Sequence, residues 1–186
     1  MKRFLVLALV ALSFNLSAKD YKVSSPNGQI AVTVSVDTQI KWSAAVNNQA
    51  IFTNNTMSLD LGTSVLGTNP KVVSAKNTSV KSTVQTVVAV KSKTIENTYN
   101  QLNLVFKPNY VVSFRVFDNG IAYRFETSQK ENITVKNEEV GLNFAGDYCV
   151  LFPEEETVYS HYKRLYLDQQ ISSLKAGRFS SILSPA

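Results

Sequence analysis

The feature that most constrains the fold is an alternation of apolar and polar residues over positions 102–126. Apolar residues occupy every second position in three short runs, separated by Lys107-Pro108-Asn109 and by Asp118-Asn119-Gly120. A period of two residues is typical of strands that bury one face, and both interruptions have turn composition. The segment therefore predicts three antiparallel strands. Asn119-Gly120 further predicts a tight turn with positive φ angles.

The same alternation recurs along the first half of the chain. Tyr21–Ser25 and Ile30–Val36 predict a hairpin around a Ser-Pro-Asn-Gly turn, and Ile40–Val46 predicts the next strand. Further strands are expected at Met57–Leu61 and at Val80–Val90. No helical periodicity occurs up to about residue 155, and short strands with frequent turns are typical of sandwiches. We predict an all-β fold, a single antiparallel β-sandwich over residues 19–170.

The first 18 residues have the pattern of a secretory signal peptide. Lys2 and Arg3 precede an apolar run at Phe4–Phe14, and Ala18 offers a small residue for cleavage. The run is shorter than the roughly 20 residues that a membrane-spanning helix needs. No cysteine stands at the cut, so a lipid anchor is not expected. We predict an exported, periplasmic protein whose mature chain begins near residue 19.

Charge and cysteine usage exclude several functions. Without Lys2 and Arg3 the formal net charge falls from +5 to +3. The remaining basic residues are dispersed, which does not resemble a nucleic-acid-binding surface and instead predicts solvated lysines on strand edges. A single cysteine, Cys149, allows no intramolecular disulfide, and its apolar neighbours predict a buried, inert thiol. The lysines considered are Lys71, Lys76, Lys81, Lys91 and Lys93.

Chemistry-bearing residues are concentrated in Leu151–Leu167, which holds three of the 14 carboxylates, the single histidine and three of the eight tyrosines. An extended backbone would place Glu154 and Glu156 on one face and Glu155 on the other. Two carboxylates on one face can bind calcium, contact sugar hydroxyls or act as an acid/base pair. A solvated strand end is the simpler interpretation of such a triplet.

Self-sufficient catalysis is not expected from this segment. His161 is the single histidine, so a serine triad or a zinc site lacks partners, and the glycines form no phosphate-binding loop. Tyr159, Tyr162 and Tyr166 have the spacing of a helical stripe that packs in a core. Beside His161 and Arg164 they are also suited to stacking on a sugar ring.

Several stretches resemble the N-terminal domain of glycoside hydrolase family 97. The run Phe114–Glu126 is similar to a hairpin found in several α-glycosidase families. The Ser-Pro-Asn-Gly turn at 25–28 adds to this, as does Phe152-Pro-Glu-Glu-Glu followed by Ser-His-Tyr and Leu-Tyr. The resemblance implies a galactose-mutarotase-like super-sandwich that packs on a catalytic (β/α)8 barrel and a C-terminal domain. Members are calcium-dependent α-glucosidases or α-galactosidases that act on oligosaccharides.

In that family the catalytic carboxylates lie on the barrel, and the sandwich-borne calcium ligand falls in an acidic motif beyond Ala186. The resemblance therefore implies no catalytic residue, metal ligand or bound cofactor in this chain. Residues 171–186 are expected to begin a connecting segment that is cut off. We predict a pocket wall or interdomain surface at Glu154, Glu155, Glu156, Ser160, His161, Tyr162 and Tyr166.

Two alternatives remain. One is a stand-alone carbohydrate-binding sandwich that uses Trp42 and the tyrosines of 159–166. The other is an independent sugar mutarotase, which a single histidine makes hard to assemble. Neither substrate specificity nor the stereochemical outcome of hydrolysis follows from the sequence, because both depend on residues of the barrel.

Overall fold

The computed structural model describes residues 18–128, 132–155, 157, 159, 164–175, 177 and 179–180. The predicted signal peptide therefore lies outside the described residues, except for Ala18. Nearly all regular structure in the described part is β-strand, accompanied by one short 3-10 turn, η1 (Ile171–Ser173). Within these ranges no helix is long and apolar enough to cross a membrane.

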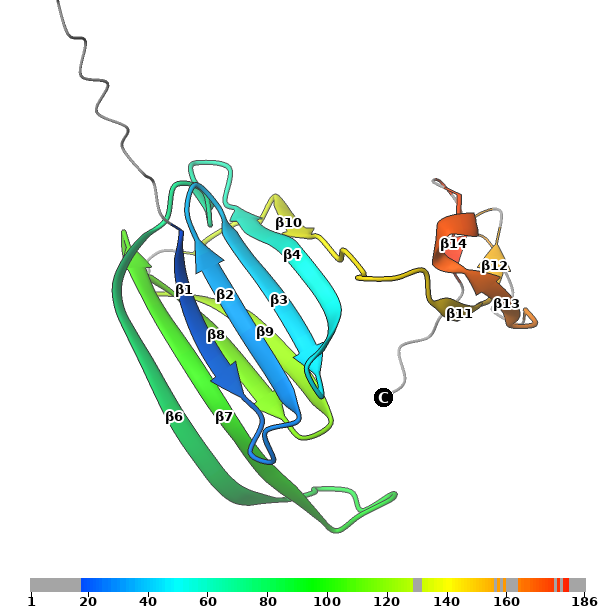
Figure 1. The fold of residues 1–186 in the computed structure, drawn as a ribbon. Helices are drawn as coiled ribbons and strands as arrows, with labels where there is room; N and C mark the ends of the chain where they lie inside the picture. The colour runs from blue at the N-terminus through cyan, green and yellow to red at the C-terminus, as the bar shows by residue number, and fades with distance from the viewer. Residues whose placement is uncertain are drawn as a thin grey trace, which may run out of the picture.

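The first sheet is a meander that the chain later rejoins. Its path runs β1-β2-β3-β4-β10, with β5 pairing on β4, and every pairing is antiparallel. Figure 1 shows this front sheet with β1 to β4 in blue to cyan and β10 in yellow. Its strands are β1 (Lys19–Ser24), β2 (Ile30–Val36), β3 (Ile40–Val46), β4 (Gln49–Asp60), β5 (Val65–Leu66) and β10 (Asn137–Val140).

The second sheet lies behind the first and is drawn in green in Figure 1. It has the order β6-β7-β8-β9 and is again antiparallel throughout. Its strands are β6 (Lys71–Gln85), β7 (Thr94–Lys107), β8 (Tyr110–Phe117) and β9 (Gly120–Thr127). Together the two sheets form the antiparallel sandwich that the sequence predicts.

The core lies between the sheets and follows the predicted alternation. Val32 and Val34 of β2 and Ile40 of β3 meet Leu104 of β7 and Phe114 of β8, and all five side chains are fully buried. The turn after β3 has positive φ at both central residues, 50° at Asn47 and 65° at Asn48, as a type I′ turn requires. The turn at 118–120 has no positive φ, so that detail of the prediction is wrong.

β6 and β7 extend past the front sheet as a long hairpin arm, seen at the bottom of Figure 1. The predicted strand over Val80–Val90 ends at Gln85, and its last valines lie in the exposed tip. The prediction of a buried face there is wrong, because no second layer among the described residues covers the arm. The lysine prediction is confirmed for Lys71, Lys76 and Lys81, which are exposed on β6, the outermost strand of its sheet. Lys91 and Lys93 are also exposed, but they lie between β6 and β7 rather than on a strand.

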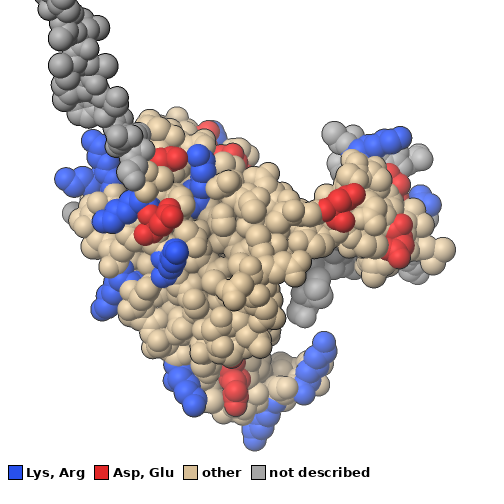
Figure 2. Space-filling view, in the orientation of Figure 1, with Lys and Arg blue, Asp and Glu red and all other residues tan. Residues whose placement is uncertain are grey.

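Charged side chains on the rest of the molecule are dispersed as well. In Figure 2 basic and acidic side chains are interspersed over the visible face, and no single basic patch stands out on it. This agrees with the interpretation that the modest positive charge is not organised to follow a nucleic-acid backbone.

After β10 the chain stays bound to the edge of β4 through residue 145. Gly141 N donates to Thr56 O at 2.9 Å, and Ala145 N donates to Ile51 O at 2.9 Å. A Cβ at position 141 would lie 2.6 Å from Thr56 Oγ1, so only glycine allows this close approach. Beyond it, two short ladders form what we call the C-terminal segment, residues 148–180. They join β11 (Cys149–Phe152) to β13 (Leu167–Gln170) and β12 (Glu154–Glu155) to β14 (Phe179–Ser180).

Candidate functional site

The predicted site lies in the C-terminal segment, which Figure 1 shows to the side of the sandwich. Phe152 of β11 pairs with Leu167 of β13, and Pro153, which is fully buried, leads directly into β12. Proline supplies no backbone donor, so the ladder breaks there and resumes with a different partner. The acidic run therefore begins on an extended strand, as the sequence analysis assumed.

Glu155 is the most constrained of the predicted site residues. Its side chain is 3% exposed, and Arg164 Nε lies 3.0 Å from its Oε2. Its Oε1 is buried and has no hydrogen-bond partner among the described residues. A solvated strand end therefore does not describe Glu155. The charged hydrogen bond to Arg164 compensates part of the cost of burying the carboxylate.

The other predicted residues are only partly placed. Glu154 is half-buried, and Tyr166 is exposed. The structure thus brings Glu154 and Glu155 together on β12 and leaves Tyr166 on the surface just before β13. The remaining predictions, Glu156, Ser160, His161 and Tyr162, lie outside the described residues.

Two of the three tyrosines, Tyr159 and Tyr166, lie in the described part of the chain and are not packed in a core. Tyr159 is 92% exposed, and Tyr166 also faces solvent, so the core-packing interpretation of their spacing is wrong for these two. They belong to a larger group of exposed apolar side chains in the same segment, which we call the C-terminal apolar surface. Its members are Leu151, Tyr159, Leu165, Tyr166 and Leu167. They are exposed on both faces of the β11–β13 ladder and beside it, because Leu151 is paired with Asp168 and Leu167 with Phe152.

Cys149 also differs from its prediction, because its side chain is exposed rather than buried. The thiol donates a hydrogen bond to Asp168 Oδ1 on the paired strand β13. This hydrogen bond and the adjacent negative charge raise the pKa of Cys149 above that of an ordinary thiol. The thiol is therefore held in its protonated, weakly nucleophilic form.

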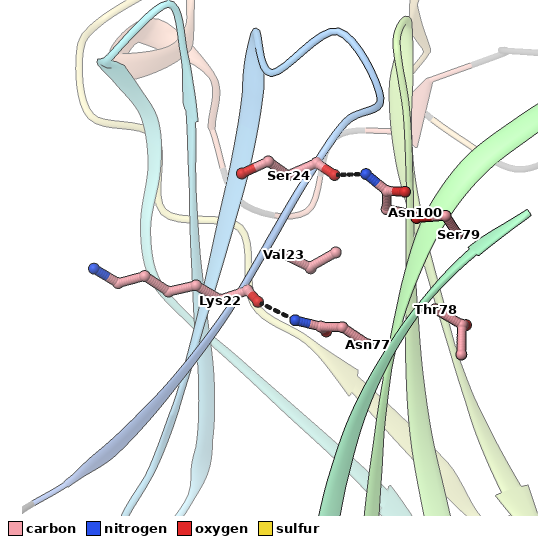
Figure 3. A pocket seen from close by; sticks show the side chains of 7 residues that line it. All are labelled: Lys22, Val23, Ser24, Asn77, Thr78, Ser79 and Asn100. Atoms are coloured by element: carbon pink, nitrogen blue, oxygen red, sulfur yellow. Dashed lines mark hydrogen bonds between the residues drawn. The ribbon is translucent and has the colours of Figure 1, made fainter.

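A polar cleft of about 360 Å³ lies between β1 and the paired strands β6 and β7 (Figure 3). Asn77 Nδ2 donates to Lys22 O at 3.0 Å, and Asn100 Nδ2 donates to Ser24 O at 2.8 Å. β1 is the edge of its sheet, so these carbonyls have no strand partner. The asparagines join the two sheets and satisfy an otherwise open edge.

An apolar cleft of about 430 Å³ opens between β3, β4 and β9. Trp42 lines it but is only 6% exposed, packed among Phe52, Phe114 and Tyr123 at ring distances of 5.5 to 6.4 Å. It offers no open ring face on which a sugar could stack. Trp42 is therefore a core residue, and the carbohydrate-binding alternative loses this contact.

Comparison with known proteins decides the family. The profile described as "Glycosyl-hydrolase 97 N-terminal" matches residues 23–184. The chain belongs to glycoside hydrolase family 97. It is 29% identical over 172 residues to a retaining α-galactosidase of Bacteroides thetaiotaomicron, a match that covers 91% of this chain and 24% of that protein.

Solved structures show the same fold at lower sequence identity. A family-97 enzyme of Pseudoalteromonas sp. strain K8, solved with acarbose, superposes with a TM-score of 0.69 at 18% identity, covering 80% of this chain and 24% of that one. A β-arabinopyranosidase superposes with a TM-score of 0.69 at 20% identity, covering 80% and 26%. The chain thus spans about a quarter of the length of these relatives.

The family-97 sandwich also has a polar group on the outer face of its second sheet. Arg124 Nε lies 2.9 Å from Glu126 Oε1. Arg115 instead donates to Gln101, and Ser113 joins the same group although it is buried. This polar group could have been found from the sequence. Its members alternate with the apolar residues of the strands, and alternating residues share one face of a sheet.

Proposed function

We propose that this chain is the non-catalytic N-terminal β-sandwich of an exported family-97 α-glycosidase. The parent enzyme would be an α-glucosidase or an α-galactosidase that acts on oligosaccharides. In this role the sandwich packs on a catalytic (β/α)8 barrel and a C-terminal domain of the same longer chain, and it forms one wall of the active-site pocket. The proposal is supported by the match to the N-terminal family profile and by the α-galactosidase activity in the name of the Bacteroides relative.

The observation that carries the interdomain role is the C-terminal apolar surface. Leu165 is 85% exposed, and Tyr159, Tyr166, Leu151 and Leu167 are exposed beside it in the sequence or on the paired strand. Apolar side chains grouped on an exposed surface mark interaction sites, because solvent contact with such a group is unfavourable. The predicted site residues Glu154 and Glu155 lie on β12, which follows Leu151 and precedes Tyr159 in the sequence. In this proposal the exposed apolar surface meets the substrate pocket there.

Calcium, in this proposal, is held by the rest of the parent enzyme. Arg164 Nε already lies 3.0 Å from Oε2 of the Glu155 carboxylate, and its positive charge opposes a cation there. Glu155 therefore fits a structural ion pair better than a metal ligand. Export to the periplasm is part of the same proposal and depends on the signal-peptide pattern of residues 1–18.

The catalytic part of the proposal is tested with the purified mature chain and aryl α-glucosides and α-galactosides, with and without added calcium. We expect no turnover in either condition. Robust hydrolysis by this chain alone would overturn the non-catalytic role.

The interface part is tested with a fluorescent dye that binds exposed apolar surface. Leu165→Glu combined with Tyr166→Glu should remove most of the dye signal. Val73→Glu, which changes an isolated exposed valine on β6, serves as the matched control and should leave the signal nearly unchanged. Equal loss in both variants would contradict an interaction surface in the C-terminal segment.

A further inference from the structure

The outer face of the second sheet carries a continuous network of polar side chains from three neighbouring strands. They occupy the positions that alternate with the core residues, so they face away from the first sheet. We call this group the outer polar network. It comprises Gln101 and Asn103 of β7, Ser113 and Arg115 of β8, and Arg124 and Glu126 of β9.

One half of the network orients Arg115. Its Nε donates to Gln101 Oε1 at 2.7 Å, and Gln101 Nε2 in turn donates to Asn103 Oδ1 at 2.6 Å. The guanidinium group also lies over the ring of Tyr99, 4.8 Å from its centroid. Two independent contacts therefore hold this guanidinium in place.

The other half orients Arg124. Its Nε lies 2.9 Å from Glu126 Oε1, and the same oxygen accepts a hydrogen bond from Ser113 Oγ at 2.6 Å. The Ser113 and Arg124 hydrogen bonds lower the pKa of Glu126, so the carboxyl group is ionised at neutral pH. Ser113 Oγ also lies 2.9 Å from Asn103 Oδ1, which connects the two halves.

A hollow of about 100 Å³ lies between the two arginines, lined by Ser113, Arg115, Ala122, Tyr123 and Arg124. The hollow exists because small residues stand beside each arginine across the ladder. Ala122 is opposite Arg115, and Ser113 is opposite Arg124. Each arginine uses Nε for its contact with the protein, and its Nη groups have no partner among the described residues. Both arginines line this hollow, and each keeps N–H donors that make no other contact among the described residues.

We propose that this hollow binds the carboxylate of an acidic saccharide, such as a uronic acid residue. Arginine side chains match a planar carboxylate through paired hydrogen bonds, and two arginines beside one glutamate leave a single positive charge for it. Glu126 Oε2, which has no partner among the described residues, can accept a hydrogen bond from a neighbouring sugar hydroxyl. This combination favours a saccharide acid over a bare carboxylate. The proposed binding site is independent of the interdomain role proposed above.

The test is an NMR titration of the purified chain with glucuronate, with glucose and acetate as the neutral and the non-saccharide probes. We expect glucuronate to shift amide resonances of β8 and β9 with a dissociation constant on the order of 1 mM, because the site is solvent-exposed. Glucose and acetate should each bind at least about tenfold more weakly. Equal shifts with acetate, or no shifts in these strands, would overturn the proposal.

Three variants locate the site. Arg115→Gln and Arg124→Gln should each weaken glucuronate binding about tenfold, whereas Lys76→Gln on β6 removes the same charge elsewhere and should have little effect. Ala122→Leu fills the hollow while retaining both arginines, and it should abolish the shifts. Binding that survives Ala122→Leu in a folded protein, judged by its amide spectrum, would contradict a site in the hollow.

Discussion

The sandwich and the C-terminal segment are both made of antiparallel ladders, yet they differ in what covers their faces. In the sandwich, β2 and β3 face β7 and β8, and side chains such as Val32, Leu104 and Phe114 are fully buried. In the C-terminal segment the buried side chains among the described residues are Pro153 and Glu155, while Leu151, Leu165 and Tyr166 are exposed. A ladder without an opposing layer leaves its apolar residues in solvent.

This difference shows that strands can pair without burying the side chains that they carry. Pairing needs only a register between two backbones, and it is present in both regions. Burial needs a second surface, and two-stranded ladders alone are marginally stable in water. The exposed apolar residues of the C-terminal segment are therefore the feature on which the proposed interdomain contact depends.

The largest expected effect contrasts a core position with an exposed one. Phe114→Ala removes a fully buried ring that packs on Trp42 and Tyr123, and we expect a loss of about 3–5 kcal/mol in the free energy of unfolding. Leu165→Ala, in the C-terminal segment, should change it by less than about 0.5 kcal/mol. Urea unfolding measures both, and similar losses would remove the distinction between the regions.

The next effect is confined to the C-terminal segment. Arg164→Ala leaves the buried carboxylate of Glu155 without its ionic partner, and we expect a local loss of about 1–3 kcal/mol. Hydrogen exchange should show faster opening of β11 and β12 while the sandwich amides are unchanged. Glu155→Gln, which removes the charge but keeps the shape, should have a smaller effect. A drop in the unfolding midpoint of the sandwich would show that the two regions unfold together.

A smaller effect tests the contact between the two sheets. Asn100→Ala removes the donor to Ser24 O at the edge of β1 and should cost about 1 kcal/mol. Asn97→Ala is the matched control, since Asn97 bonds Ser82 within the hairpin arm at 3.0 Å. Its cost should be close to zero in the same thermal unfolding experiment, because the arm has no covering layer. If the control costs as much as Asn100→Ala, the arm is part of the cooperative unit.

The smallest effect is chemical rather than energetic. Asp168→Ala removes the carboxylate that raises the pKa of Cys149, so the thiol should lose its proton at lower pH. Alkylation of Cys149 by iodoacetamide at neutral pH should become faster. Mass spectrometry measures this rate, because Cys149 is the single cysteine of the chain. Asp147→Ala removes a nearby carboxylate that bonds Ser172 instead, and it should not change the rate. An unchanged alkylation rate in the Asp168 variant would show that the hydrogen bond to Asp168 does not control the reactivity of the Cys149 thiol.

Much of the sandwich can be predicted from the sequence because period-two alternation reports directly which face of a strand is apolar. Val34 and Phe114 are examples, each flanked by polar residues and each buried as predicted. Val84 and Val88 alternate in the same way but are exposed, because alternation does not reveal whether a second layer lies opposite. That information depends on the relative lengths of the two sheets.

The candidate site was less predictable because its properties depend on tertiary neighbours. The sequence placed Glu155 in an acidic run, but its burial and its pairing with Arg164, nine positions away, are tertiary properties that the run itself does not reveal. Cys149 lies in an apolar run that predicts burial, yet its side chain is exposed in the described part of the structure. The outer polar network was visible as the polar half of the alternation, and only its hydrogen bonds required the structure.

The order of strands has a consequence for how the chain folds. Within each sheet the path from β1 to β4, or from β6 to β9, joins strands that follow one another in the sequence, so most contacts close short loops. β10 is the exception, since it pairs residues 137–140 with residues 57–60 across the whole second meander. Folding rates fall as contacts become more distant in sequence. The return of β10 is therefore the expected kinetic bottleneck, and the two meanders can form before it.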